Sequence, residues 1–200
     1  MKPPKAPVSN RPVLALVCLA LVIATLAIYS QTFGYGFVAY DDDKYVYENP
    51  VLRAGLTGTN VAWALSTFYF ANWYPLTWIS YLTDVQFFGV NAGEMHAVNV
   101  LLHVLTTLLL FLALVRMTQQ PWRCALVAGL FALHPLNVQS VAWISDRKDV
   151  LSAFFAALTL FLYAGYARAP SALRYISVAL ALALSLMSKT MAVTDRKSVV

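Results

Sequence analysis

Residues 95–115 read MHAVNVLLHVLTTLLLFLALV, a run without a single charged side chain. A helix rises about 1.5 Å per residue, so about 20 such residues cross a bilayer core of about 30 Å. Glu94 precedes the run and Arg116 follows it. This stretch predicts a membrane-spanning helix, and with it the class of fold.

The composition of the whole chain points the same way. Of its 200 residues, 60% are hydrophobic and 12% are charged, against about 25% charged in a soluble domain. The mean hydropathy is +0.65 and the net charge is +5. The basic residues lie in short clusters between apolar runs, which indicates membrane topology rather than a nucleic-acid partner. Cys18 and Cys124 fall in or beside apolar segments, so neither a disulfide framework nor a CxxC metal site is indicated.

Four more apolar runs accompany the first and predict an all-α membrane protein with about five spans. The expected spans are about 13–29, 95–115, 124–143, 150–167 and 175–188. The first could be a cleaved signal peptide, but no A-x-A-like site closes it and it is long for an h-region, so we expect an uncleaved anchor. The last requires Arg174 and Lys189 to reach the two interfaces.

Another charge-free stretch, between Arg53 and Asp84, is interrupted by glycine, threonine, asparagine and proline and is rich in aromatic residues. Such residues favour helices that lie in the membrane interface. We therefore expect residues 30–94 to form a large outer loop with interfacial helices.

The charges divide by side under this arrangement, which supports it. The cytoplasmic segments then hold only basic residues: Lys2, Lys5, Arg11, Arg116, Arg123, Arg168 and Arg174. All nine acidic residues lie on the other side. Since short cytoplasmic loops are the basic ones, we expect a multi-pass protein of the cell inner membrane, with residues 1–12 as a cytoplasmic tail.

Three aspartates in a row, Asp41, Asp42 and Asp43, follow the first span. Mutual repulsion tends to raise the pKa of at least one, which suits a general base. Carboxylates near a membrane surface can also hold a metal ion or be a solvated turn. The residues alone leave these readings open.

Arg147 and Lys148 are cations on the acidic side, in the segment ISDRKD (144–149), and Lys189 is a third. A cation there asks for an anionic partner such as a phosphate. An ion pair with Asp146 or Asp149 is the alternative. His96, Asn99 and His103 follow helical spacing and so share one stripe that faces other helices; such residues either join helices or, together with His134, bind zinc.

Five blocks of sequence resemble one known family. They are FVAYDDDKYVYENPVL (37–52), NWYPLTWISYLTDVQFFGVNAG (72–93), HAVNVLLH (96–103), FALHPLNVQSVAWISDRKDVLS (131–152) and LMSKTMAVT (186–194). In order and spacing the chain is similar to the membrane O-mannosyltransferases that carry tetratricopeptide repeats, and to their bacterial glycosyltransferase relatives of the GT-C class. The resemblance covers nearly all of residues 13–194.

The resemblance implies a GT-C-like fold that transfers a sugar from a polyprenyl-phosphate carrier to a hydroxyl of a protein acceptor on the extracytoplasmic side. By position, Asp41 or Asp42 is then the base, and Arg147 and Lys189 bind the lipid phosphate. The supporting residues would be His103, His134 and Asp149. No cofactor is predicted, and the resemblance leaves a divalent metal open.

Gln139 departs from the family, which usually has an acid in its H-P-x-x-x-E block. This departure weakens any metal role. The alternative function is a non-catalytic membrane protein that binds or moves a polyprenyl-linked lipid. The likeness breaks at Asp195, so residues 195–200 are a non-matching tail, and we expect the chain to be a truncated piece that is inactive alone.

Overall fold

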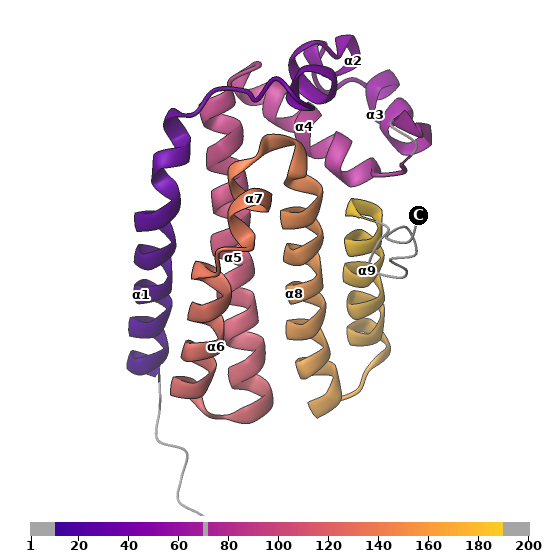
Figure 1. Cartoon of the computed structure of the whole chain (residues 1–200). Coiled ribbons are helices and arrows are strands. Elements are labelled where there is room, and N and C mark those ends of the chain that lie inside the picture. The colour runs from indigo at the N-terminus through magenta and orange to yellow at the C-terminus, as the bar shows by residue number, and fades with distance from the viewer. Residues whose placement is uncertain (1–10, 70–71, 190–200) are drawn as a thin grey trace, which may run out of the picture.

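The computed structural model describes residues 11–69 and 72–189, and five of its helices stand side by side (Figure 1). They are α1 (Arg11–Tyr29), α5 (Ala92–Thr118), α6 (Pro121–Leu133), α8 (Arg147–Arg168) and α9 (Ala172–Ser188). Shorter helices α2 (Pro50–Arg53), α3 (Gly58–Ser66) and α4 (Pro75–Phe88) lie across one end of this bundle, and α7 (Asn137–Ala142) lies between α6 and α8. We call residues 35–91 the cap, and the two ends of the bundle the capped end and the basic end.

Three helical stretches are long and apolar enough to cross a membrane: Arg11–Gly34, Ala92–Thr118 and Ile144–Arg168. Two shorter apolar helices, α6 and α9, have 13 and 17 residues. Each of the five expected spans thus contains a helix, and the expectation of an all-α membrane protein is confirmed.

The expected span 124–143 does not form one continuous helix. Helix α6 ends at Leu133, His134 adopts an extended conformation with φ −68° and ψ 130°, and α7 begins at Asn137. Pro135 explains the break, because proline lacks an N–H and forces the residue before it out of the helical region. A helix of 13 residues rises only about 20 Å, less than the bilayer core.

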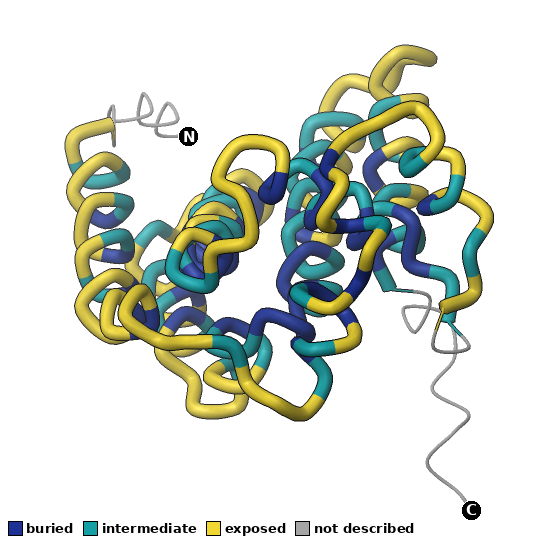
Figure 2. The backbone as a smooth tube through the Cα atoms, turned by 90° about the horizontal axis from the view of Figure 1, so that it is seen from above, coloured by how far each residue is buried: buried dark blue, intermediate teal, exposed yellow. Residues whose placement is uncertain are grey.

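The outer faces of the bundle helices are exposed (Figure 2), and many of their exposed side chains are large and apolar. Leu19, Ile23, Leu126 and Leu180 are each more than half exposed. Exposed large apolar side chains in this number indicate contact with lipid rather than water. The bilayer is therefore part of the environment that this fold requires.

The charges separate between the two ends of the bundle. Arg116 and Arg168 lie near the last residues of α5 and α8, while Arg123 and Arg174 lie in the first turns of α6 and α9. These four termini lie at the same end of the bundle, the basic end (Figure 1). Lys2, Lys5 and Asp195 lie outside the described residues. The described acidic side chains lie in the cap or beside it, as the sequence predicts.

The cap has a hydrophobic core of its own. Trp78 of α4 is fully buried, and its ring lies 5.2 Å from that of Tyr45 and 5.4 Å from that of Trp63. Met95 and Ile144 join the same cluster from the bundle. The cap is thus packed onto the ends of α5 and α8, and this packing fixes the aspartate segment above them.

Candidate functional site

Asp42 connects the cap to the bundle. Its side chain is fully buried, and its Oδ2 accepts a hydrogen bond from the Val38 backbone N–H at 2.9 Å. Its Oδ1 accepts from the Ser145 backbone N–H at 3.0 Å and from the Ser145 hydroxyl. Ser145 belongs to the 3-10 turn Ile144–Asp146 before α8. A carboxylate that accepts three hydrogen bonds is stable when buried, so Asp42 fixes the position of the aspartate segment.

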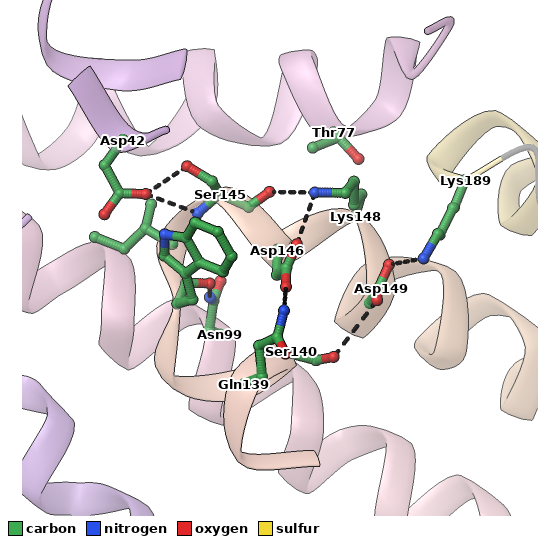
Figure 3. A network of polar contacts seen from close by, with 12 residues as sticks. Asp42, Thr77, Asn99, Gln139, Ser140, Ser145, Asp146, Lys148, Asp149 and Lys189 are labelled. Carbon is green, nitrogen blue, oxygen red and sulfur yellow. Dashed lines mark hydrogen bonds and ion pairs between the residues drawn. The ribbon is translucent and has the colours of Figure 1, made fainter. Parts of the chain in front are cut away.

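A series of polar contacts continues from this point (Figure 3). The Lys148 Nζ donates to the Ser145 carbonyl at 2.9 Å and to the Asp146 carboxylate at 2.7 Å. The other oxygen of Asp146 accepts from the Gln139 side-chain amide at 2.9 Å. An acid in place of Gln139 would set two carboxylates against each other, so the amide suits its neighbour.

A second set of polar contacts begins at Ser140, the neighbour of Gln139 in the chain, and ends at Lys189, the last described residue. Ser140 donates to Asp149 over 3.5 Å, and the Lys189 Nζ lies 2.5 Å from the other oxygen of Asp149. Lys189 and Asp149 are each about a quarter exposed. We call the two sets together the polar network: Asp42, Gln139, Ser140, Ser145, Asp146, Lys148, Asp149 and Lys189.

Asp41 differs from its neighbour. It is half-buried, and its carboxylate forms no hydrogen bond or ion pair with any residue in the described part of the chain. It nonetheless lies close enough to Tyr45 to raise the pKa of the Tyr45 hydroxyl, and the Lys148 Nζ lies 5.7 Å from the same ring. Asp41 is thus an available carboxylate beside the polar network.

Arg147 lies in a separate, buried group. It is fully buried and pairs with Asp84 of α4. Its Nε donates to the Asn99 side chain at 2.7 Å and its Nη2 to the Met95 carbonyl at 2.7 Å. With Ser80 as a further acceptor at 3.2 Å, four of the five N–H donors of the guanidinium are used.

These contacts revise the role expected for Arg147. A cation enclosed by protein acceptors offers no open face to a lipid phosphate, so its surroundings favour a structural role that joins α4, α5 and α8. The structure therefore places Asp42 in one set of contacts, with Ser145, Lys148, Asp146 and Gln139, and Lys189 in a second set, with Asp149 and Ser140. The two sets meet only where Gln139 and Ser140 are neighbours in the chain, and Asp41 lies beside the first set. Arg147 has no contact with either set, because its partners are Asp84, Asn99, Met95 and Ser80.

The histidines lie elsewhere. His103 is buried in the bundle, where its Nε2 contacts the Ala132 carbonyl at 3.0 Å and its ring meets Tyr29 edge-on. His134 is exposed at the break after α6 and accepts from the Leu136 N–H. His96, Asn99 and His103 are all buried, so the predicted inward stripe is confirmed. Within residues 11–69 and 72–189, no group of three or more His, Cys, Asp or Glu could hold a metal ion.

Sequence reasoning missed two partners. Ser145 binds Asp42 from 103 positions along the chain, and Asp84 pairs with Arg147 from 63 positions away. A buried cation predicts that an acid exists nearby, but no local pattern says which one.

Burial raises the pKa of several groups in the cap, and Asp84 and Tyr45 lie nearest the contacts described above. It raises the pKa of the Asp84 carboxyl, and the attraction of Arg147 opposes that rise. Burial, helped by Tyr74, Asp41 and Asp146, raises the pKa of Tyr45 to about 12. Perturbed groups of this kind gather at functional sites and in structural ion pairs alike.

Together the fold and the polar network define a helical membrane protein with acidic and basic side chains joined at one end of its bundle. The chain belongs to the dolichyl-phosphate-mannose-protein mannosyltransferase family, whose model matches residues 55–194. The match includes Lys148 and Lys189 and begins after Asp41 and Asp42.

Curated relatives agree with this family. Protein O-mannosyl-transferase TMTC1 of Mus musculus is 31% identical over 78% of this chain and 18% of its own length. Tmtc1 of Drosophila melanogaster is 31% identical over 73% of the chain, and TMTC2 of Homo sapiens is 30% identical over 69%; in each the match covers 17% of the relative. The chain thus spans less than a fifth of these relatives' length. No solved structure matches it.

Proposed function

We propose that this chain carries part of the active site of a membrane glycosyltransferase. The reaction transfers a sugar from a polyprenyl-phosphate carrier to a hydroxyl of a protein acceptor. The observation that carries the proposal is the contact between Asp42 and Ser145, because the Ser145 carbonyl also binds Lys148 and so the aspartate segment lies next to a lysine at one end of the bundle. The printed names of the family and its relatives support the same reaction class.

Asp41 is the general base in this proposal. The acceptor hydroxyl oxygen attacks the anomeric carbon, and its proton passes to the Asp41 carboxylate. The bond between that carbon and the phosphate oxygen breaks, and polyprenyl phosphate leaves with the electron pair. Asp42 cannot serve equally well, because its oxygens already accept three hydrogen bonds.

Lys148 and Lys189 stabilise the phosphate that leaves. Both are partly exposed, with 17% and 23% of the side chain accessible, whereas Arg147 is enclosed. In the described structure each lysine has a carboxylate partner. An incoming phosphate would share or replace that partner, as expected for a cation that must also release its ligand.

The experiment measures transfer of labelled mannose from polyprenyl-phosphate mannose to an acceptor peptide by membranes that contain a complete homologous chain with these residues. Lys189→Gln should lower the rate by about 10² to 10³, the usual loss on removing one group that stabilises developing charge. The matched control is Lys44→Gln, which removes an exposed lysine from the cap but leaves the polar network intact.

Equal rates for both variants and the unaltered protein would contradict the proposal. Binding of the labelled carrier without any transfer would instead favour a protein that binds or moves the lipid. Gln139 favours this non-catalytic function, because it supplies no acid where the family usually has one.

The proposed site requires the capped end to face away from the cytoplasm, with residues 1–12 cytoplasmic in a cell inner membrane. Spans 13–29, 95–115, 124–143, 150–167 and 175–188 keep this order even though the third is interrupted, and residues 195–200 lie outside the described residues.

With Cys18 and Cys124 replaced by serine, Lys44→Cys should react with an impermeant reagent added from outside. Gln120→Cys, exposed at the basic end, should not react. The reverse pattern would invert the protein and remove the site from the outer face.

A further inference from the structure

Three arginines line a hollow at the basic end. That end lies opposite the helices of the cap (Figure 1). The hollow has a volume of about 450 Å³ and lies where α5 and α8 end and α9 begins. Its lining residues are Arg116, Leu162, Gly165, Arg168, Ala169 and Arg174. Among residues 11–69 and 72–189, none of these arginines forms an ion pair with a carboxylate.

Two of the arginines have structural partners. Arg174 donates to the carbonyls of Gly165 at 3.2 Å and Ala169 at 2.7 Å, and Arg168 donates to the carbonyl of Arg116. Cations commonly bind the free carbonyls at a helix C-terminus. Helix capping therefore explains why these two side chains lie where they do, but it leaves their charge without a counter-anion.

Arg116 has no such explanation. Its guanidinium lies 3.7 Å from the centroid of the Phe161 ring and donates no hydrogen bond to any residue that the structure describes. A guanidinium stacked on a ring keeps its fork of donors in one plane, which matches the oxygens of a phosphate. Its Nη1 lies near Gly165, where an added Cβ would be 3.7 Å away, at ordinary van der Waals distance.

The surroundings of the hollow select a lipid. A second hollow of about 280 Å³ shares Arg116 and Arg168 and is lined by Met117, Tyr163 and two alanines. Met117 and Tyr163 are each at least half exposed. A phosphate in the first hollow can therefore continue into an acyl chain over the second, which a free phosphate ion cannot use.

We propose that the arginine hollow at the basic end binds the phosphate of an anionic phospholipid, with an acyl chain on the apolar surface beside it. Basic pockets between membrane helices recognise lipid headgroups in this way. The site is independent of the proposed glycosyltransferase activity, because it lies at the other end of the bundle.

The test is native mass spectrometry of the 200-residue chain in detergent, titrated separately with phosphatidylglycerol and phosphatidylcholine. The unaltered chain should retain phosphatidylglycerol more tightly than phosphatidylcholine. Arg116→Gln should weaken phosphatidylglycerol binding about fivefold, the effect of one arginine near an anionic headgroup. The matched control, Arg123→Gln, removes an arginine from the same end that lines a different hollow, and it should change binding by less than about twofold.

Gly165→Leu fills the hollow without removing a charge and should weaken phosphatidylglycerol binding as well, so the test does not depend on a single variant. Circular dichroism confirms that each variant keeps its helix content. Equal retention of the two lipids, or an equal loss in Arg116→Gln and Arg123→Gln, would overturn the proposal. Displacement of the lipid by millimolar inorganic phosphate would show a site for a soluble anion and would also overturn it.

Discussion

The capped end and the basic end both contain several cations, but these cations differ in burial and in whether a carboxylate pairs with them. At the capped end, Arg147, Lys148 and Lys189 each have a carboxylate partner, and Arg147 is fully buried. At the basic end, Arg116 and Arg168 are exposed and have no carboxylate partner among the described residues. At the capped end, pairing with a carboxylate offsets the desolvation energy of the buried cation. At the basic end the cations remain accessible to water or lipid headgroups and so keep their solvation.

The difference separates charges that hold the fold together from charges that can bind a ligand. A buried ion pair has little freedom to exchange its partner, because a lone charge in its place would be costly. An exposed cation can exchange partners readily. Within the capped end the same distinction divides Arg147 from Lys189, and Asp42 from Asp41.

The largest expected effect is the loss of Arg147. Arg147→Met should lower the free energy of unfolding by about 3 to 5 kcal/mol, because Asp84 remains buried without its cation. Arg116→Gln, at the basic end, should change it by less than about 0.5 kcal/mol. Denaturant titration in detergent, followed by circular dichroism, measures both. Similar losses in the two variants would remove the distinction between the ends.

A smaller effect is expected at the contact between cap and bundle. Ser145→Ala removes the hydroxyl that donates to Asp42 but keeps the backbone N–H. We expect a loss of about 1.5 to 3 kcal/mol, the range for a hydrogen bond to a charged group. The matched control is Ser177→Ala, whose exposed hydroxyl donates only within α9. If both substitutions have the same effect on the same titration, Asp42 does not depend on Ser145.

The smallest effect is a pH dependence of the cap. Burial raises the pKa of Tyr45 from 10.0 to about 12, so the unfolded chain loses this proton at lower pH than the folded one. The stability linked to Tyr45 is complete below pH 10 and declines as the pH rises toward about 12. Thermal unfolding in detergent across this range should show the decline, and Tyr45→Phe should reduce it. An unchanged slope in Tyr45→Phe would assign the decline to other groups.

The sequence predicts the helices and the separation of charge between the two ends, because both follow from local composition. Runs of apolar residues must form helices in lipid to satisfy their own hydrogen bonds. Pro135 indicates a break at His134, because a proline disfavours the helical conformation in the residue before it. The apolar residues on both sides favour one continuous span, and that is what we expect from the sequence alone.

The partners at the site could not be predicted, because they depend on packing between distant segments. Asp84 lies in a stretch whose aromatic residues suggest an interfacial helix, and only the packing of α4 against α5 and α8 brings it to Arg147. The roles of Asp41 and Asp42 are likewise indistinguishable in sequence, since they are adjacent and identical. They differ only in whether Ser145 reaches them.

The most direct test of the account compares Asp41→Asn with Asp42→Asn in a complete homologous chain, measuring unfolding and mannose transfer on the same preparations. Asp41→Asn should unfold like the unaltered protein and lose transfer by about 10² to 10⁴, the contribution of a positioned base. Asp42→Asn should lower the free energy of unfolding by about 1 to 3 kcal/mol, because its amide presents a donor to the N–H of Val38 or of Ser145. Full transfer by Asp41→Asn, or unaltered stability of Asp42→Asn, would contradict the division of roles proposed for these two aspartates.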